Sequence, residues 1–412
     1  MAAGVSRALD KVPNVPGPLP INSGALVMGG DYRGLALVRS LGRQGIQVWA
    51  INQEEQLWAG MSRFARKTLF YPRWDREEGV AFLLDLGRKW GLEGWMLFPT
   101  SDDSVRLVSI HYKRLSEVFR VTVPPWESLE RVVDKKLLHQ LADQVGVDRP
   151  KTYYAACREQ LASLELSFPL ILKPATRHEL NRLTAAKAWR VDDSDSLLSR
   201  YDEACHLLPP ESLMIQELIP GGGESQFSFA AACEEGRPLA YLVARRTRQF
   251  PMDFGRASTF VETVDEPGVI EPSKKLLQAI KYTGLVEVEF KRDPRDGRFK
   301  LLDFNPRVWG WYSLCEGAGV NFGYLLWLQY LRQPIPKVSV RPGVRWVRMT
   351  SDLLASLEEI RGGRLSMSEY LRSVSGPKES AIFSWDDLLP GLLEIPLLSY
   401  VASRRFLRGN GL

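Results

Sequence analysis

Two short segments near residue 300 carry carboxylate and amide side chains at a spacing that could bind a divalent cation. The segments LVEVEF and FKLLDFNP flank the turn DPRDG, a pattern typical of a β-hairpin. Pairing about this turn predicts that Glu289 faces Asp303, with Asn305 on the same face. Two carboxylates opposed across a ladder destabilise a sheet unless a cation lies between them. Oxygen ligands alone favour Mg²⁺ bound with phosphates, and a solvated acidic face is the alternative.

Basic side chains upstream of this hairpin could bind anions. Lys173 ends the apolar segment FPLILKP, where a lysine suits a polyphosphate unless it reaches a local acid or solvent. Lys135 opens a helical pattern that ends at Gly146. In ARRTRQFP, strand alternation predicts that Arg246 and Arg248 share one face. Either guanidinium could bind a substrate carboxylate, and a solvated basic turn is the alternative.

In their order along the chain, these segments resemble the ATP-grasp ligases. The hairpin looks like that family's metal motif, in which an acidic residue faces an acid-x-Asn-x-Arg sequence. Lys135 looks like the family's first ATP-binding lysine, and Lys173 looks like its second. The residues that match the metal motif are Glu289, Asp303, Asn305 and Arg307.

The segment QELIPGGGES resembles the adenine hinge of the same family. The resemblance implies that the backbone of Glu217, Leu218 and Ile219 meets the adenine edge, and that Glu224 reaches the ribose hydroxyls. A plain glycine turn with an exposed acid is the alternative.

The chain departs from the family after Lys173, where many members have a glycine-rich loop over the phosphates. Here ATRHELNRLTAAKAW, residues 175–189, contains no glycine, and Arg177, Arg182 and Lys187 could grip phosphate oxygens instead. The whole chain looks most like the predicted carboxylate–amine ligases related to D-aspartate ligase, which share its opening pattern GGDYRGLALVRSLG.

This resemblance implies a reaction. A substrate carboxylate attacks the γ-phosphate of ATP and forms an acyl phosphate, which an amine then converts into an amide. Mg²⁺ (or Mn²⁺), held by the three hairpin ligands, would bridge the β- and γ-phosphates, and Arg307 would stabilise charge on the transferring group. The implied partners are ATP, a small carboxylate and a small amine. A kinase on the same fold is the alternative, because nothing in the sequence marks the amine.

The elements that must position these residues indicate an α/β protein of several units. After a lead over residues 1–21, the pattern GALVMGG, helix, GIQVWAIN predicts a doubly wound parallel sheet over residues 22–125. Residues 126–335 are expected to form the α+β subdomains of an ATP-grasp architecture, with antiparallel sheets that enclose ATP. Residues 336–412 are expected to be a helical extension.

Composition restricts the class of protein further. The net charge of +5 comes without a basic block interleaved with aromatic residues, which argues against nucleic acid. Scattered histidines and four cysteines without CxxC spacing argue against zinc or a disulfide framework and favour a cytoplasmic protein. No segment reaches the ~18 apolar residues of a helix that spans a membrane. The sequence does not decide whether the protein forms a homo-oligomer.

Two other functions also stay open. MGGDYRG could be the dinucleotide-binding turn of an NAD-type oxidoreductase, although its glycine spacing is incomplete and Asn52 and Gln53 stand where a ribose-binding acid is expected. The segment LLPGLLEIPLLSYVASRRFLR, apolar and ending in arginines, would suit an ATP-binding scaffold or sensor with peripheral membrane contact. Packing of this segment on the protein's own core is the favoured interpretation.

Overall fold

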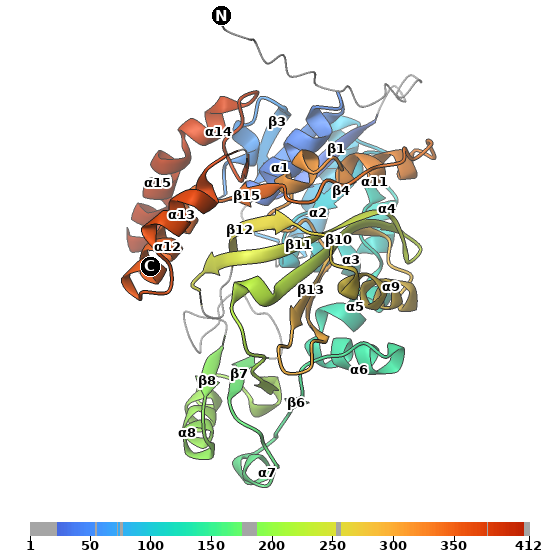
Figure 1. The fold of residues 1–412 in the computed structure, drawn as a ribbon. Helices are drawn as coiled ribbons and strands as arrows, with labels where there is room; N and C mark the ends of the chain where they lie inside the picture. Colours follow the sequence, from blue (N-terminus) through green and yellow to red (C-terminus); the bar gives the residue numbers. More distant parts are fainter. Residues whose placement is uncertain are drawn as a thin grey trace, which may run out of the picture.

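The computed structural model describes residues 23–53, 56–71, 73–74, 77–174, 188–252, 257–376 and 378–407. The expected lead and the basic loop with Arg177, Arg182 and Lys187 therefore lie outside the described residues. The described part contains three sheets, with helices around them (Figure 1).

The N-terminal unit is a parallel sheet with the strand order β3-β2-β1-β4-β5. Its central strand is buried on both faces, as a doubly wound sheet requires, because Ala25 packs in one core cluster and Leu26 in another. The strands are β1 (Gly24–Met28), β2 (Gln47–Asn52), β3 (Ala65–Phe70), β4 (Met96–Pro99) and β5 (Arg120–Val121). The helices are α1 (Tyr32–Gly42), η1 (Ala59–Met61), α2 (Glu78–Trp90), α3 (Asp102–Ile110) and α4 (Tyr112–Ser116).

A seven-stranded sheet forms the centre of the molecule, with the order β14-β13-β10-β11-β12-β15-β16 (Figure 1). All of its strand pairs are antiparallel except β15 with β16. The last two strands come from residues 336–412, the part expected to be a helical extension. The strands are β10 (Gln226–Glu234), β11 (Arg237–Phe250), β12 (Ala257–Thr263), β13 (Gly284–Arg292), β14 (Phe299–Asn305), β15 (Arg345–Val347) and β16 (Glu379–Ser380).

A smaller antiparallel sheet, ordered β6-β9-β7-β8, projects at the lower end of Figure 1 with its own apolar core. The predicted fold class, α/β with a parallel N-terminal sheet and antiparallel sheets after it, is confirmed. The elements of this unit are β6 (Thr152–Tyr153), α7 (Arg158–Ala162), β7 (Leu170–Pro174), β8 (Trp189–Val191), α8 (Ser194–Cys205), η2 (Pro210–Ser212) and β9 (Leu213–Glu217). The short helix η3 (Gly223–Ser225) follows and packs against β11.

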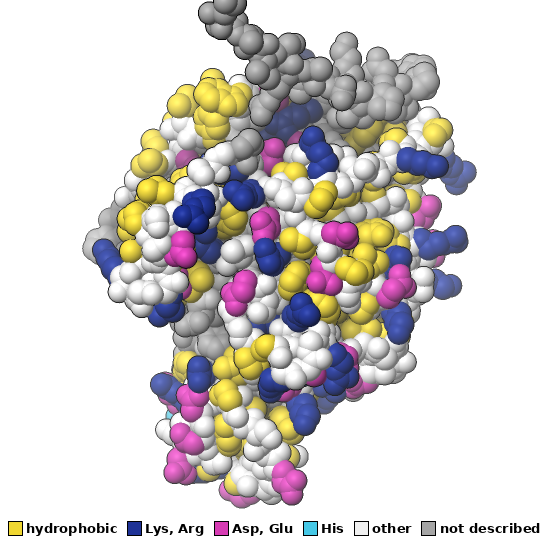
Figure 2. Space-filling view, in the orientation of Figure 1, with side chains coloured by type: hydrophobic (Ala, Val, Ile, Leu, Met, Phe, Trp, Pro, Cys, Tyr) yellow, Lys and Arg dark blue, Asp and Glu magenta, His cyan; other side chains and the backbone are white. Residues whose placement is uncertain are grey.

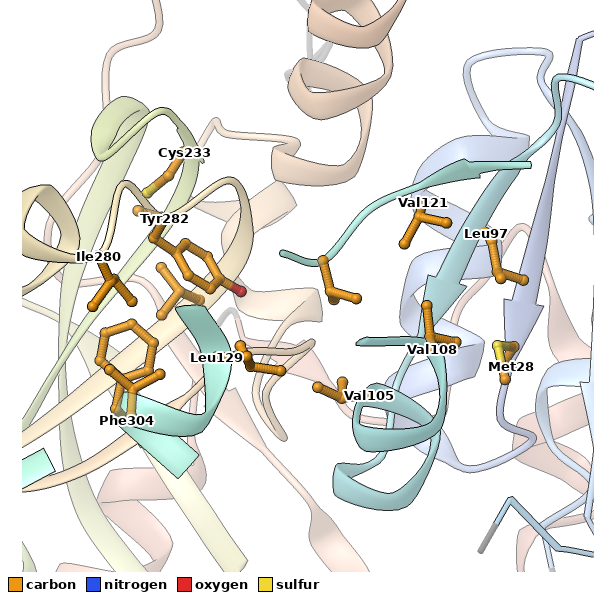
Figure 3. Close-up of a cluster of buried hydrophobic side chains, with 14 of the residues drawn as sticks. Met28, Leu97, Val105, Val108, Val121, Leu129, Cys233, Ile280, Tyr282 and Phe304 are labelled. Atoms are coloured by element: carbon orange, nitrogen blue, oxygen red, sulfur yellow. The ribbon is translucent and has the colours of Figure 1, made fainter. Parts of the chain in front are cut away.

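One continuous core joins the parallel sheet to the seven-stranded sheet. Figure 3 shows it running from Met28 and Leu97, past Leu129, to Tyr282 and Phe304. Leu129 is fully buried and lies between the two sheets. It belongs to α5 (Trp126–Val133). The other linking helices are α6 (Lys135–Val145), η4 (Pro267–Val269) and α9 (Ile270–Ala279).

The C-terminal helices are fixed to the N-terminal unit by a buried ion pair. Arg39 in α1 donates from Nε to Asp387 at 2.8 Å, and the other Asp387 oxygen accepts from the Arg63 backbone at 2.9 Å. Burial of a paired charge fixes this junction, because neither partner can be left alone without a large cost. The helices are α10 (Ser313–Gly317), α11 (Phe322–Tyr330), α12 (Met349–Arg361), α13 (Met367–Val374), α14 (Leu388–Leu392) and α15 (Glu394–Leu407).

The shared core predicts that Leu129→Ala weakens both units together. We expect the free energy of unfolding to fall by about 2–5 kcal/mol, as for other buried Leu→Ala changes, without a new separate transition. Urea titration followed by circular dichroism measures this. Leu207→Ala, at an exposed position, should change it by less than about 0.5 kcal/mol. Early unfolding of one unit alone would contradict the shared core.

Candidate active site

The hairpin of β13 and β14 pairs Glu289 directly with Asp303, in the register that the sequence predicted. Val288 and Phe304, which alternate with these residues, are buried in the core shared with α5 and α6. The acidic side chains and Asn305 therefore lie on the opposite face of the sheet. The predicted juxtaposition of the two carboxylates with the amide is present.

A β-bulge lies directly beside this pair. Phe290 pairs with Leu301 while Glu289 pairs with Asp303, so Leu302 is an extra residue in β14. A bulge bends its strand and changes the direction of neighbouring side chains. It therefore sets how Asp303 is presented next to Glu289.

The polar side chains of the hairpin are held by one another. Asn305 donates from Nδ2 to Glu289 at 2.7 Å and to Glu287 at 3.2 Å. Asp303 accepts from the Lys135 ammonium and from the Phe304 backbone at 2.9 Å. The first lysine predicted for the nucleotide thus lies against one of the predicted metal ligands.

Glu287 is a buried acid that belongs to the same cluster. Its side chain is 5% exposed, and one of its oxygens accepts from Trp311 Nε1 at 2.8 Å. Burial, together with repulsion from Glu289, raises the pKa of Glu287 to about 7. Strand alternation puts Glu287 on the same face as Glu289, but that spacing alone does not mark it as part of a site.

Arg246 neutralises the cluster from the neighbouring part of the sheet. The residue is 5% exposed, and its guanidinium forms an ion pair with Glu289. Its Nε has no hydrogen-bond partner among the described residues. Arg246 also lines a cavity of about 70 Å³ that is bounded by the hairpin on one side and by Tyr32 and Arg33 of α1 on the other. A buried donor without a partner at a cavity wall suits a ligand oxygen.

Arg307 connects the hairpin to the N-terminal unit. It donates from Nε to Asp102 at 2.5 Å and from Nη2 to the Asn305 oxygen at 3.1 Å. Asp102 opens α3, which the Ser101 hydroxyl caps. An acid from the first unit therefore orients an arginine that reaches the cavity.

Arg248 lies in different surroundings from Arg246. Its guanidinium forms a bidentate ion pair with the buried Asp352 of α12, at 2.9 and 2.7 Å. It also lies over the ring of Phe260. The register between β11 and β12 shifts on both sides of Arg248, so simple alternation does not hold there. The structure does not bring this predicted site residue to either of the two cavities described in this section.

The predicted hinge lines a second cavity, of about 380 Å³. Leu218 and Ile219 form part of its wall, and Lys291 closes another part while donating to the Gly221 carbonyl at 2.5 Å. Lys173, one strand away in the same small sheet, donates to Gln216 at 2.8 Å. The hinge and the second predicted lysine are thus brought into one region.

The two acids of this segment are engaged by the protein itself. Glu217 accepts from the Lys151 backbone at 3.1 Å and forms ion pairs with Arg295 and Lys300. Glu224 accepts from the Gly222 backbone at 2.9 Å and is exposed. Glu217 therefore fixes the hinge to the neighbouring elements, while its backbone continues into the cavity wall.

The first turn of the N-terminal unit does not favour a dinucleotide. The Asp31 side chain accepts from the backbone amides of Arg33 and Gly34, at 2.9 and 3.1 Å, and occupies the start of α1. A diphosphate would need those amides and would meet a carboxylate there. A Cβ on Gly30 would lie 1.7 Å from the Gln56 carbonyl oxygen, so the protein's own chain fills this turn.

Comparisons with known proteins point to one family. A family model described as "ATP-grasp in the biosynthetic pathway with Ter operon" matches residues 210–351, which include the hinge and the hairpin. D-aspartate ligase of Enterococcus faecium is 25% identical over 229 residues, 52% of this chain and 53% of that protein. The C-terminal section of a carbamoyl phosphate synthase large chain from Methanopyrus kandleri is 21% identical over 44% of this chain and 34% of that protein. The matches thus span about half, or less, of these relatives.

These matches support a relationship between this chain and the ATP-grasp carboxylate–amine ligases. The resemblance predicted from its motifs is confirmed. Solved structures show the same ATP-grasp fold at low sequence identity. An L-amino acid ligase from Bacillus licheniformis has a TM-score of 0.58 and 15% identity, with 78% of each chain covered. An ADP complex of an N5-carboxyaminoimidazole ribonucleotide synthetase has a TM-score of 0.63 and 14% identity, covering 84% of this chain and 87% of that one.

The contact between Asp102 and Arg307 generates a prediction. Asp102→Asn should lower kcat for ATP turnover by about tenfold to a hundredfold, because a misplaced charge stabiliser loses much of its effect. The KM for ATP should change much less, since the hinge lies elsewhere. Asp102→Glu should restore part of the rate. Asp103→Asn, which removes the same charge one residue away, is the control, and an equal loss in both variants would contradict the role of Asp102.

Proposed function

We propose that this protein is an ATP-dependent carboxylate–amine ligase. The observation that carries the proposal is the hairpin, where Glu289 and Asp303 face each other beside Asn305 and Arg307. This arrangement concentrates oxygen ligands and cations on one face of the sheet, between the N-terminal unit and the hinge. Its ATP-grasp relatives named above include two amino acid ligases.

The side chains present fit a hard divalent cation. Among the described residues, no three His, Cys, Asp or Glu side chains form a group that could hold a metal. The site would therefore rely on the Glu289 and Asp303 carboxylates and the Asn305 amide, with phosphate and water oxygens completing the shell. Such a partial protein shell is usual for Mg²⁺ that is bound with a nucleotide. When bound, Mg²⁺ (or Mn²⁺) would neutralise charge on the β- and γ-phosphates.

The nucleotide would lie across the two sheets. The adenine would occupy the 380 Å³ cavity against Leu218 and Ile219, with Glu217 holding the hinge and Glu224 near the ribose. Lys173 and Lys135 would neutralise phosphate charge. The phosphate-binding role of Lys187, which lies outside the described residues, stays a prediction.

The acid substrate would occupy the 70 Å³ cavity. The unpaired Nε of Arg246 would donate to its carboxylate, and Arg307 would stabilise negative charge as that carboxylate attacks the γ-phosphorus and ADP leaves. The amine nitrogen would then attack the acyl carbon, form the C–N bond and release phosphate and a proton. Arg248 takes no part in this scheme, because Asp352 holds it.

The hairpin predicts the effect of two substitutions. Asp303→Asn and Asn305→Ala should each lower Mg²⁺-dependent ATP turnover by about a hundredfold or more, because each removes a ligand or its charge. Both variants should remain folded, which a cooperative thermal unfolding transition would show. Asp296→Asn, in the exposed turn of the same hairpin, is the matched control. Full activity in the Asp303 or Asn305 variant would exclude this metal site.

Phosphate release in the presence of pairs of small carboxylates and amines tests the ligase proposal itself. A ligase releases phosphate only when both substrates are present. A kinase needs no amine and retains the phosphate on its product, while an ATP-binding scaffold shows neither response.

The two lysines should differ in their effect on ATP binding. Lys173→Ala should raise the Kd for ATP by about tenfold to a hundredfold, because it removes a cation that would neutralise phosphate charge beside the hinge. Lys135→Ala should have a smaller effect, since Lys135 already compensates Asp303. Titration calorimetry measures both, with Lys136→Ala as the control. Equal and negligible losses would place the phosphates elsewhere.

A further inference from the structure

Large apolar side chains are exposed mainly in the C-terminal part of the described chain. Of those that are exposed, six lie in residues 23–348 and twelve lie between 349 and 400. Figure 2 shows hydrophobic side chains along the upper left edge of the molecule, over α14 and α15. Isolated exposed apolar residues are normal, but a dense group of them marks an interaction surface.

The densest part of this group is a surface formed by the end of one loop, α14 and α15. We call it the C-terminal apolar surface. Trp385 is 84% exposed, Ile395 71% and Leu392 68%. With side chains of about 200 Å² each, such residues expose several hundred Å² of apolar area, at or above the largest patch of an ordinary monomer. The members are Trp385, Leu388, Leu389, Leu392, Ile395 and Tyr400.

This surface is held in place from behind. Pro390 and Leu397 are buried against the protein, so α14 and α15 pack through one side as the sequence analysis favoured. Directly before α14, Asp387 pairs with Arg39 and Asp386 pairs with Arg43. The exposed side is therefore a fixed, preformed surface rather than the frayed end of a chain.

The charge pattern around the surface favours one kind of occupant. Between residues 388 and 403 the only charged residue is Glu394, which accepts from the Thr350 hydroxyl at 2.9 Å. Arg404 and Arg405 follow in the last turn of α15, and Arg408 comes directly after the helix. A tryptophan and a tyrosine among leucines, followed by arginines, is the composition of segments that lie in the interface of an anionic membrane.

In the part of the chain that the structure describes, every helix is too short or too polar to cross a bilayer. We propose that the C-terminal apolar surface docks on an anionic membrane surface, with its apolar side chains in the headgroup region. Neither cavity of the candidate active site is lined by a member of this surface.

Flotation of the full chain with lipid vesicles tests the proposal. The protein should float with vesicles of phosphatidylcholine and phosphatidylglycerol, and at least about tenfold less with phosphatidylcholine alone, because three arginines add electrostatic attraction. The double variant Leu392→Glu/Ile395→Glu should lose flotation while keeping its thermal unfolding midpoint. Replacing Arg404, Arg405 and Arg408 with Glu should remove the preference for phosphatidylglycerol.

Ile110→Glu/Leu207→Glu is the matched control, because it adds the same charges at comparably exposed apolar positions elsewhere. This variant should float like the wild type. Absence of flotation, or equal loss in both double variants, would overturn the proposal. Light scattering tests the competing occupant, a second copy of the chain. If the wild type is a dimer that does not bind vesicles, and Leu392→Glu/Ile395→Glu makes it a monomer, the surface is a dimer interface.

Discussion

Compensation of buried negative charge is the constraint on which the candidate site depends. Glu287 and Glu289 lie on one face of the same sheet as Asp303, and an uncompensated charge in such a place costs several kcal/mol. Arg246 and Lys135 supply the opposite charges, and Asn305 bridges the two glutamates. A divalent ion would strengthen this balance, and each cation would then be available to phosphate or carboxylate oxygens. The same side chains thus stabilise the fold and define where a nucleotide complex would be neutralised.

The compensating groups come from parts of the chain that are far apart, which explains the need for this architecture. Lys135 comes from the start of α6, Arg246 from β11, and Asp102 reaches Arg307 from the N-terminal unit. The positions of these side chains relative to the hairpin are fixed because α5 packs in the core that both large sheets share. Loss of that packing would separate Asp102 from Arg307 without changing any residue of the cavity. Positioning over such distances requires a rigid core rather than a local motif.

The sequence predicted the parts of the site that follow from local periodicity. The pairing of Glu289 with Asp303 follows from a short turn and the two-residue period of strands, and the structure has this pairing. Arg248 does not share the surroundings of Arg246, as strand alternation had predicted, because two register shifts flank it. Such irregularities leave no clear mark in the residue pattern. Asp102 could not be found, since it contacts a residue 205 positions away through tertiary packing alone. The two cavities likewise depend on how the units pack, which spacing does not encode.

One helix connects the candidate active site to the C-terminal apolar surface. The start of α1 places Tyr32 and Arg33 at the smaller cavity, and its last turns and C-cap hold Asp387 through Arg39 and Asp386 through Arg43. Eleven helical residues span roughly 16 Å, so the two regions keep a fixed separation. Allosteric coupling needs an element with two alternative arrangements, and a helix packed in the core is not one. Membrane docking would therefore act by concentrating the enzyme at a surface, with the chemistry of its site unchanged.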